Sequence, residues 1–199
     1  MVLGIYTSVG KGRIGLSEPI SVWNKVRVGV FQGNGGAQTC IWETIASIQL
    51  DPEMTVRTIT TGDIANGVLR DLDAIIIPGG EGATQYMNIG EENMERIRNF
   101  IRSGKGAVGI CAGAYLFTDT PGYACMHING GKAIDIEHDN RGHGISAFSL
   151  TAEGKKLFPE LAKRDKSYVM YYEGPVLVKS DNIPLPYTTM AIMETDVHE

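Results

Sequence analysis

The stretch Val108-Gly109-Ile110-Cys111-Ala112-Gly113-Ala114-Tyr115 decides the fold. An apolar strand end runs into Gly-x-Cys-x-Gly, and small residues that can begin a helix follow. This pattern predicts a nucleophile elbow, a sharp strand-to-helix turn with cysteine at the nucleophile position. Gly109 and Gly113 fit because a Cβ at either position would crowd the turn. The alternative is an ordinary turn with a buried cysteine, since free cysteines are often buried.

Short apolar runs alternate with helical patterns ahead of this turn. Strands are predicted at 26–31, 54–60, 73–77 and 107–110. Helices are predicted at 37–50 and 91–102, with a short helix or turn at 63–69 and a helix starting at 112–117. The alternation predicts an α/β fold with a mostly parallel sheet and right-handed crossovers. In the run 73–77 every residue after Asp73 is apolar, as in a strand that helices cover on both faces.

The C-terminal half has a more antiparallel pattern. Strands are predicted at 132–137 and 145–150, a short helix at 151–158, and a strand pair or hairpin at 168–178. Residues 1–25 contain several glycines and Pro19, and they read as a lead-in without a predicted element. We expect residues 26–199 to form a single domain.

Composition excludes several function classes. The 199 residues carry a net charge of −5, which argues against nucleic acid or an anionic membrane surface as a partner. No apolar run approaches a membrane-spanning length, and the N-terminus lacks a signal-peptide pattern. Three cysteines without CxxC argue against a disulfide framework or a zinc site. We therefore expect a cytoplasmic protein without a metal or other cofactor.

Three glycine-rich loops follow predicted strands, at 32–36, 78–83 and 111–114. The carboxyl ends of parallel strands share one sheet edge, where α/β folds bind ligands. A helix N-terminus favours the thiolate of Cys111. The N–H groups of Ala112 and of Gly79 or Gly80 would stabilise an oxyanion, and Gly33 would contact a ligand.

A proton carrier is also needed, and His127 and Glu81 are the candidates. His127 also fits a surface or packing role, and Glu81 also fits the start of a helix. His138 and His143 lie in a run that reads as a solvated loop, and Cys40 reads as core packing. The run 171–175 ends a strand and either walls the pocket or forms a hairpin turn.

Four stretches together resemble the class I glutamine amidotransferase-like superfamily, and within it the domain at the N-terminus of eukaryotic biotin–protein ligases, which also occurs as stand-alone microbial proteins. They are Pro78-Gly79-Gly80, Gly109 to Tyr115, Leu150-Thr151-Ala152-Glu153-Gly154 to Phe158, and Tyr171-Tyr172-Glu173-Gly174-Pro175. The resemblance implies a three-layer flavodoxin-like sandwich with Cys111 at the elbow. It does not imply biotin transfer, because the ligase catalytic domain belongs to another part of those longer proteins.

The chain also departs from the superfamily pattern. Glutaminases carry a His and a Glu late in the chain, and the late pair here is His198-Glu199, without the strand expected before it. Two functions stay open: a Cys-dependent enzyme that hydrolyses or transfers at an amide carbonyl, and a non-catalytic module that binds a small molecule or a partner. A redox sensor at Cys111 is a third interpretation. We expect a small-molecule substrate or ligand and allow for a homodimer.

Overall fold

Four parallel strands form the central sheet of this computed structural model, which describes residues 2–3, 6–9, 13–16, 20–21, 25–134, 142–181 and 187–195. They are β5 (Val26–Phe31), β6 (Met54–Ile59), β7 (Ala74–Ile77) and β8 (Gly106–Gly109), in the spatial order β6-β5-β7-β8. Val30 faces Thr58 on one side and Ile76 on the other. The strand order reverses between β5 and β7, which makes their carboxyl ends the switch point where such sheets bind ligands. The predicted parallel sheet is confirmed.

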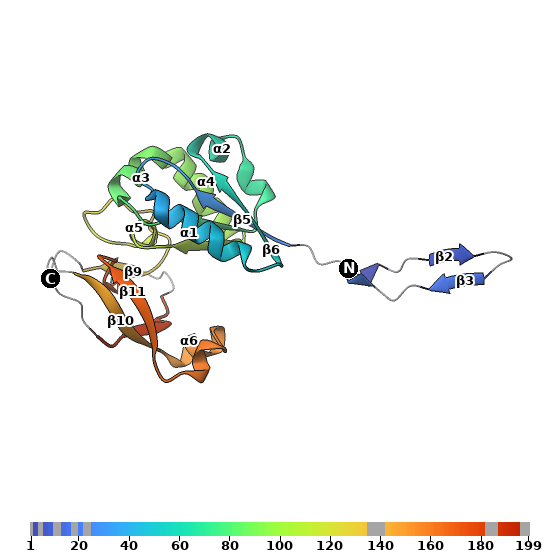
Figure 1. Cartoon of the computed structure of the whole chain (residues 1–199). Coiled ribbons are helices and arrows are strands. Elements are labelled where there is room, and N and C mark those ends of the chain that lie inside the picture. Colours follow the sequence, from blue (N-terminus) through green and yellow to red (C-terminus); the bar gives the residue numbers. More distant parts are fainter. Residues whose placement is uncertain are drawn as a thin grey trace.

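Helices cover both faces of the sheet (Figure 1). On one face Ile41 and Ile48 of α1 (Gln38–Gln49) pack with Val28 and Val30. The opposite face carries α2 (Thr61–Ala65), the 3₁₀ turn η1 (Val68–Asp71), α3 (Gly82–Ile89), α4 (Glu91–Arg102) and α5 (Ala112–Phe117). Side chains alternate along each strand, so Ile75 and Ile77 join this second, larger core. The result is the three-layer α/β sandwich.

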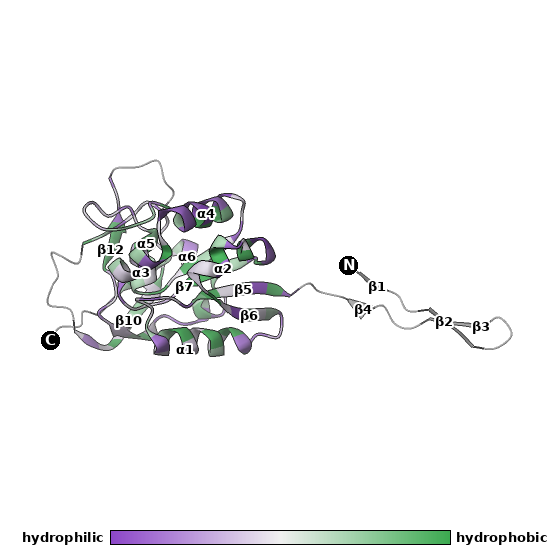
Figure 2. Cartoon of the chain, turned by 90° about the horizontal axis from the view of Figure 1, so that it is seen from above, coloured by the Kyte–Doolittle hydropathy of each residue, from purple (hydrophilic) through white to green (hydrophobic). Residues whose placement is uncertain are grey.

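Helix α4 has the predicted bounds, and its apolar face lies against the sheet (Figure 2). Met94, Ile97 and Phe100 are buried, while its glutamates and arginines form ion pairs on the outer side. Helix α3 was not predicted. It has eight residues, begins at a glycine and buries only Gln85 and Ile89, so its amphipathic pattern is too short to stand out.

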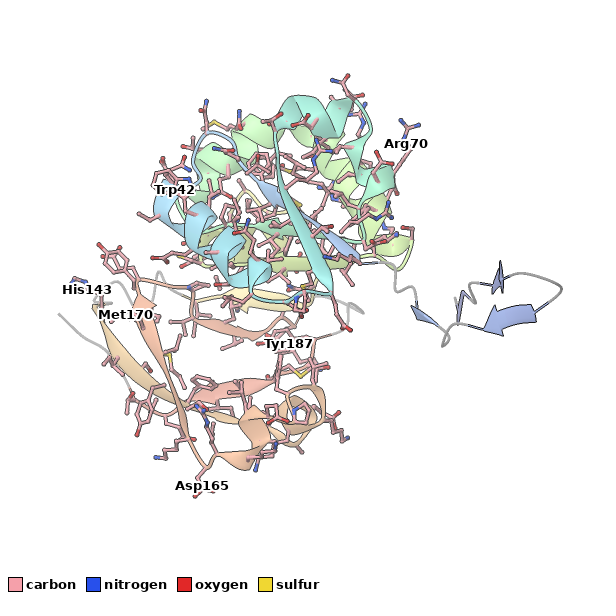
Figure 3. All side chains as sticks on the ribbon, turned by 45° about the vertical axis from the view of Figure 1, so that its right-hand side comes forward. Trp42, Arg70, His143, Asp165, Met170 and Tyr187 are labelled. Carbon is pink, nitrogen blue, oxygen red and sulfur yellow. The ribbon has the colours of Figure 1, made fainter. Side chains whose placement is uncertain are left out.

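The C-terminal half is antiparallel, as predicted. It holds β9 (Gly131–Ala133), β10 (His143–Leu150), α6 (Ala152–Leu157), the 3₁₀ turn η3 (Leu161–Lys163), β11 (Ser167–Tyr172), β12 (Leu177–Lys179) and β13 (Ala191–Met193). One sheet has the order β11-β10-β13, and β12 pairs with β9. Figure 3 shows the β10–β11 ribbon beside the parallel sheet, with His143 and Met170 on it.

Two sequence expectations for these regions need correction. The run 168–178 is not a hairpin, because β11 pairs with β10 while β12 pairs with β9. Glu173, which follows β11, has φ +47° and turns the chain away from β11. Residues 1–25 do contain elements: β1 (Val2–Leu3) pairs with β4 (Ile20–Ser21), and β2 (Tyr6–Val9) with β3 (Arg13–Leu16). These short strands were not predicted because the glycines around them weaken the strand pattern. The strands project away from the rest of the structure (Figure 1).

Asp73 joins three strands at the edge of the sheet opposite the glycine loops. Its carboxylate accepts hydrogen bonds from the Arg27 guanidinium at 3.0 Å, from the Arg27 N–H at 3.0 Å and from Lys105 Nζ at 2.8 Å. These donors, Arg27 first, hold the pKa of Asp73 below its ordinary range. The stabilisation is therefore complete above about pH 4, the unfolded-state value, and is lost as the pH falls further.

An Asp73→Asn variant is expected to be less stable than the wild type at pH 7. The difference should shrink as the pH falls below about 4, because the unfolded wild-type chain then binds a proton that the native Asp73 carboxylate must give up. Urea unfolding at a series of pH values measures this. Asp165→Asn, an exposed position in the bend before β11, is the control and should show no such trend. A difference between wild type and Asp73→Asn that does not vary with pH would refute the assignment.

Candidate functional site

Cys111 forms the turn between β8 and α5, and its backbone has φ 51° and ψ −112°. These are the angles of the first central residue of a type II′ turn, a position that glycine normally occupies. The N–H of Gly113 donates to the carbonyl of Ile110 at 2.9 Å, and that of Ala114 to the carbonyl of Cys111 at 2.9 Å. Cys111 is half-buried and stands at the N-terminus of α5. This is the predicted nucleophile elbow.

The two glycines beside Cys111 permit a very close approach of backbones. A Cβ on Gly113 would lie 2.0 Å from the carbonyl oxygen of Ile77 in β7, and a Cβ on Gly109 would lie 2.4 Å from the carbonyl oxygen of Gly113. Both obstacles are backbone atoms of the core, which cannot rotate away as a side chain can. The elbow therefore requires glycine on each side of its cysteine.

The three glycine loops meet at the carboxyl edge of the sheet. Gly36 and Gly80 form an isolated bridge, in which the N–H of Glu81 donates to the Gly35 carbonyl at 2.7 Å. A Cβ on Gly79 would lie 3.2 Å from the Cβ of Cys111, so this second loop passes directly beside the elbow. Gly33 lies against Asn88 of α3 and is not among the residues around Cys111.

The backbone N–H groups near Cys111 differ in their partners. The N–H of Gly79 donates to Cys40 Sγ at 3.1 Å, so Gly79 is already engaged. Within the part of the chain that the structure describes, the N–H groups of Gly80 and Ala112 have no protein acceptor. Both residues line the same cavity as Cys111. They are the two donors that could stabilise a negative oxygen there.

The cavity at Cys111 has a volume of about 300 Å³. Its walls include Gly80, Ala112, Tyr115, Tyr123 and Glu173. The rings of Tyr115 and Tyr123 are stacked, with centroids 6.0 Å apart and planes 7° from parallel. Glu173 directly follows β11, a strand of the antiparallel β11-β10-β13 sheet. Both halves of the chain therefore build this cavity.

The structure does not bring the two predicted proton carriers into contact with Cys111. His127 Nδ1 lies 2.6 Å from Asp119 Oδ1, and its ring nitrogens lie 3.8 Å from Cys125 Sγ. Glu81 occupies the N-cap position of α3, where its exposed side chain makes no capping hydrogen bond. Neither residue lines the cavity. His138 and His198-Glu199 lie outside the described residues.

Gln85, fully buried on α3, was missed by the sequence analysis. Its Nε2 atom donates to the carbonyl oxygens of Pro78 at 3.0 Å and Gly35 at 3.2 Å, so one side chain ties two glycine loops together. A single polar residue on the inner face of an expected amphipathic helix would have been a signal, but that helix was itself not predicted.

The rest of the described structure was searched for a second cavity, for metal ligands and for membrane-spanning helices. A cavity of about 640 Å³ lies around Lys25, Arg27 and Asp73, at the amino edge of the sheet, and no cysteine is among its described lining residues. In the described ranges, no group of three or more His, Cys, Asp or Glu side chains is placed to hold a metal ion. None of the helices in those ranges has both the length and the apolar character needed to cross a membrane.

A family model described as "Biotin-protein ligase, N terminal" matches residues 26–141, from the first central strand past the elbow. The chain belongs to this family. It is a class I glutamine amidotransferase-like domain. Members of the same superfamily among curated proteins include Pyridoxal 5'-phosphate synthase subunit PdxT of Picrophilus torridus, 28% identical over 149 residues, which are 66% of this chain and 75% of that protein.

PdxT of Bacillus cereus strain B4264 is 38% identical over 90 residues, 43% of this chain and 45% of that protein, so the chain spans less than half of the Bacillus relative. Two solved structures share the fold of this biotin-protein ligase N-terminal family member. The crystal structure of SMU.1228c has a TM-score of 0.54 at 18% identity and covers 87% of this chain and 70% of that one. The glutaminase domain of Trypanosoma brucei CTPS with bound acivicin has a TM-score of 0.50 at 10% identity, and the match covers 76% of this chain and 67% of that one.

Proposed function

We propose that this domain acts on the carbonyl carbon of a small amide through Cys111. The observation that carries the proposal is the combination of a cysteine at an elbow with the N–H groups of Gly80 and Ala112, which have no protein acceptor, on one cavity of about 300 Å³. In this reaction the thiolate sulfur bonds to the carbonyl carbon, and Gly80 and Ala112 stabilise the oxyanion. The C–N bond then breaks, ammonia leaves with a proton, and water cleaves the thioester to a carboxylate.

The leaving ammonia must receive a proton from an acidic group. We propose that His127 or Glu81 delivers this proton. Since neither side chain lines the cavity, the proton would pass through a water molecule. The PdxT relatives are named as synthase subunits, which supports a protein partner for this chain, and a homodimer stays a prediction. All three cysteines are free, in keeping with the cytoplasmic location that we propose.

One observation favours a non-catalytic binding module as the second candidate. The ring of His127 is held by Asp119 at 2.6 Å, and no histidine of the described ranges lines the cavity at Cys111. Release of ammonia from L-glutamine and simple primary amides separates the two functions. Turnover that depends on Cys111 supports the enzyme, and ligand binding without turnover supports the module.

A further inference from the structure

One of the two backbone donors at the Cys111 cavity lies between two glycines. Gly79 and Gly80 are consecutive, and the peptide unit that joins them carries the Gly79 carbonyl oxygen and the Gly80 N–H. Glycine adopts many backbone conformations, so the loop sequence alone does not fix the direction of this peptide unit. Gly80 has φ +141°, and a Cβ there would lie 2.0 Å from the Gly35 carbonyl oxygen. Contacts from outside the loop must therefore hold the donor in place.

The contacts of the Gly79 carbonyl set the direction of the Gly80 N–H. This carbonyl oxygen accepts a hydrogen bond from the Ala37 N–H at 2.9 Å, and Gln85 Nε2 lies 3.4 Å from it. In a planar trans peptide the carbonyl and the N–H point in opposite directions. The Gly80 N–H therefore points away from Ala37 and Gln85, neither of which lines the cavity, whereas Gly80 itself does.

Gln85 makes further contacts to the same loop from a fully buried position on α3. Its Nε2 atom donates to the Pro78 carbonyl at 3.0 Å and to the Gly35 carbonyl at 3.2 Å. Carbonyl oxygens only accept hydrogen bonds, so the NH₂ end of the amide must be the end that faces them. The Gly35 carbonyl also accepts from the Glu81 N–H at 2.7 Å. One amide thus contacts the loop just before the donor and, through Gly35, just after it.

The other end of the amide shows that packing alone does not explain Gln85. Its Oε1 atom is buried and has no hydrogen-bond partner among the described residues. A buried polar atom without a partner costs free energy, which an apolar side chain of similar shape would avoid. The hydrogen bonds from Nε2 to the loop carbonyls are what such an apolar side chain could not supply.

We propose that Gln85 is a positioning residue for the reaction at Cys111. It holds the Gly79–Gly80 peptide unit so that the Gly80 N–H faces the substrate oxygen as negative charge develops on it. Because Gln85 does not line the cavity, it acts through the loop and not by contact with the substrate. This inference rests on the proposed function, since it concerns an oxyanion donor of that reaction.

Two reagents separate oxyanion stabilisation from the reactivity of the Cys111 thiol. With p-nitrophenyl acetate the thiolate bonds to the carbonyl carbon, an oxyanion forms, and p-nitrophenolate leaves. With iodoacetamide the thiolate bonds to a saturated carbon and iodide leaves, so no oxyanion forms. The acylation rate is the part of p-nitrophenolate release that is lost in Cys111→Ser, and peptide mass spectrometry gives the alkylation rate. The ratio of acylation to alkylation measures the donors, because the thiolate fraction affects both rates alike.

Gln85→Met removes the NH₂ donor and keeps nearly the same side-chain volume. We expect the ratio of acylation to alkylation to fall about tenfold. Complete loss of one donor typically costs about 10²- to 10³-fold, but here the Ala37 N–H still holds the Gly79 carbonyl. Gln85→Leu, which also lacks the donor, should show the same fall and serves if Gln85→Met does not fold.

Asn93→Leu is the matched control. Asn93 is 8% exposed and is the other buried side-chain amide of the described ranges, and its Nδ2 atom donates to the Ile89 carbonyl at 2.9 Å. Neither residue lines the cavity or belongs to the glycine loops. This variant should lower the thermal unfolding midpoint and leave the ratio unchanged, so it separates general loosening of the fold from the effect on the donor.

Three outcomes would overturn the role of Gln85. They are a wild-type ratio in both Gln85 variants, an equal fall in Asn93→Leu, and a wild-type Cys111 that is alkylated but never acylated. Failure of the proposed function looks different, because the ratio would still fall in Gln85→Met while the wild type released no ammonia from any amide. With an amide that is turned over, Gln85→Met should lower kcat about tenfold and leave KM unchanged.

Discussion

A Cys111→Ser variant is expected to lose the release of ammonia from amides, by about 10³-fold or more relative to the wild type. A hydroxyl is a poor nucleophile at neutral pH unless a base within hydrogen-bond reach activates it, and neither His127 nor Glu81 lines the cavity at the elbow. The substitution is nearly isosteric, so the N–H groups of Gly80 and Ala112 stay in place. The measurement is the rate of ammonia release, together with the thermal unfolding midpoint of each variant.

Cys125→Ala is the matched control. Cys125 is 3% exposed, its Sγ lies 3.6 Å from the Thr120 carbonyl oxygen, and it does not line the cavity. This variant should keep most of the activity. If Cys111→Ser retained wild-type turnover, the reaction would have to use another group. If no amide were turned over by the wild type, the binding module would stand in place of the enzyme.

A Gly113→Ala variant is expected to lower the free energy of unfolding by about 3 kcal/mol, at the upper end of the usual cost of overpacking. The added methyl group would lie 2.0 Å from the Ile77 carbonyl oxygen and 2.7 Å from the Ile77 carbonyl carbon. Strand β7 is central in the sheet and Ile77 is fully buried, so neither backbone can move without disturbing the core. Urea unfolding gives the difference directly.

Gly62→Ala provides the comparison at a glycine with room. The nearest atom to a Cβ there is Thr60 Oγ1 at 3.7 Å, and Gly62 lies within α2. Alanine is a better helix former than glycine, so this variant should be more stable than the wild type by about 0.5 to 1 kcal/mol. A Gly113→Ala protein as stable as Gly62→Ala would mean that α5 and β7 do not approach each other as closely as the elbow requires.

The central sheet and the elbow could be predicted because their signals are local. A valine-rich run marks β5, a continuous apolar run marks β7, and Gly-x-Cys-x-Gly specifies the turn through steric limits that act within five residues. The meeting of the three glycine loops also followed, since parallel strands end at one edge. Each of these predictions needs only the residues of one short segment or the order of the segments along the chain.

The parts that were missed or left open depend on contacts between distant segments. The run 171–175 was expected either to wall the pocket or to form a hairpin turn, and Glu173 of that run lines the cavity. That outcome depends on the pairing of β11 with β10, which no spacing in the sequence reveals. His127 was paired with Cys111 as a hypothesis, whereas the structure sets its ring on Asp119. In the sequence Gln85 looks like any polar helix residue. Its role depends on hydrogen bonds to the carbonyl oxygens of Gly35 and Pro78, which lie in two different loops.

The central claim is that Cys111 is an accessible nucleophile on the cavity. The most direct test measures the rates at which iodoacetamide alkylates the three cysteines of the native protein. Peptide mass spectrometry resolves Cys40, Cys111 and Cys125 in one experiment. Cys125 should react slowest, because burial covers its sulfur and raises the pKa of its thiol. The account predicts that Cys111 reacts first and well ahead of Cys125; a Cys111 that reacts no faster than Cys125 would contradict it.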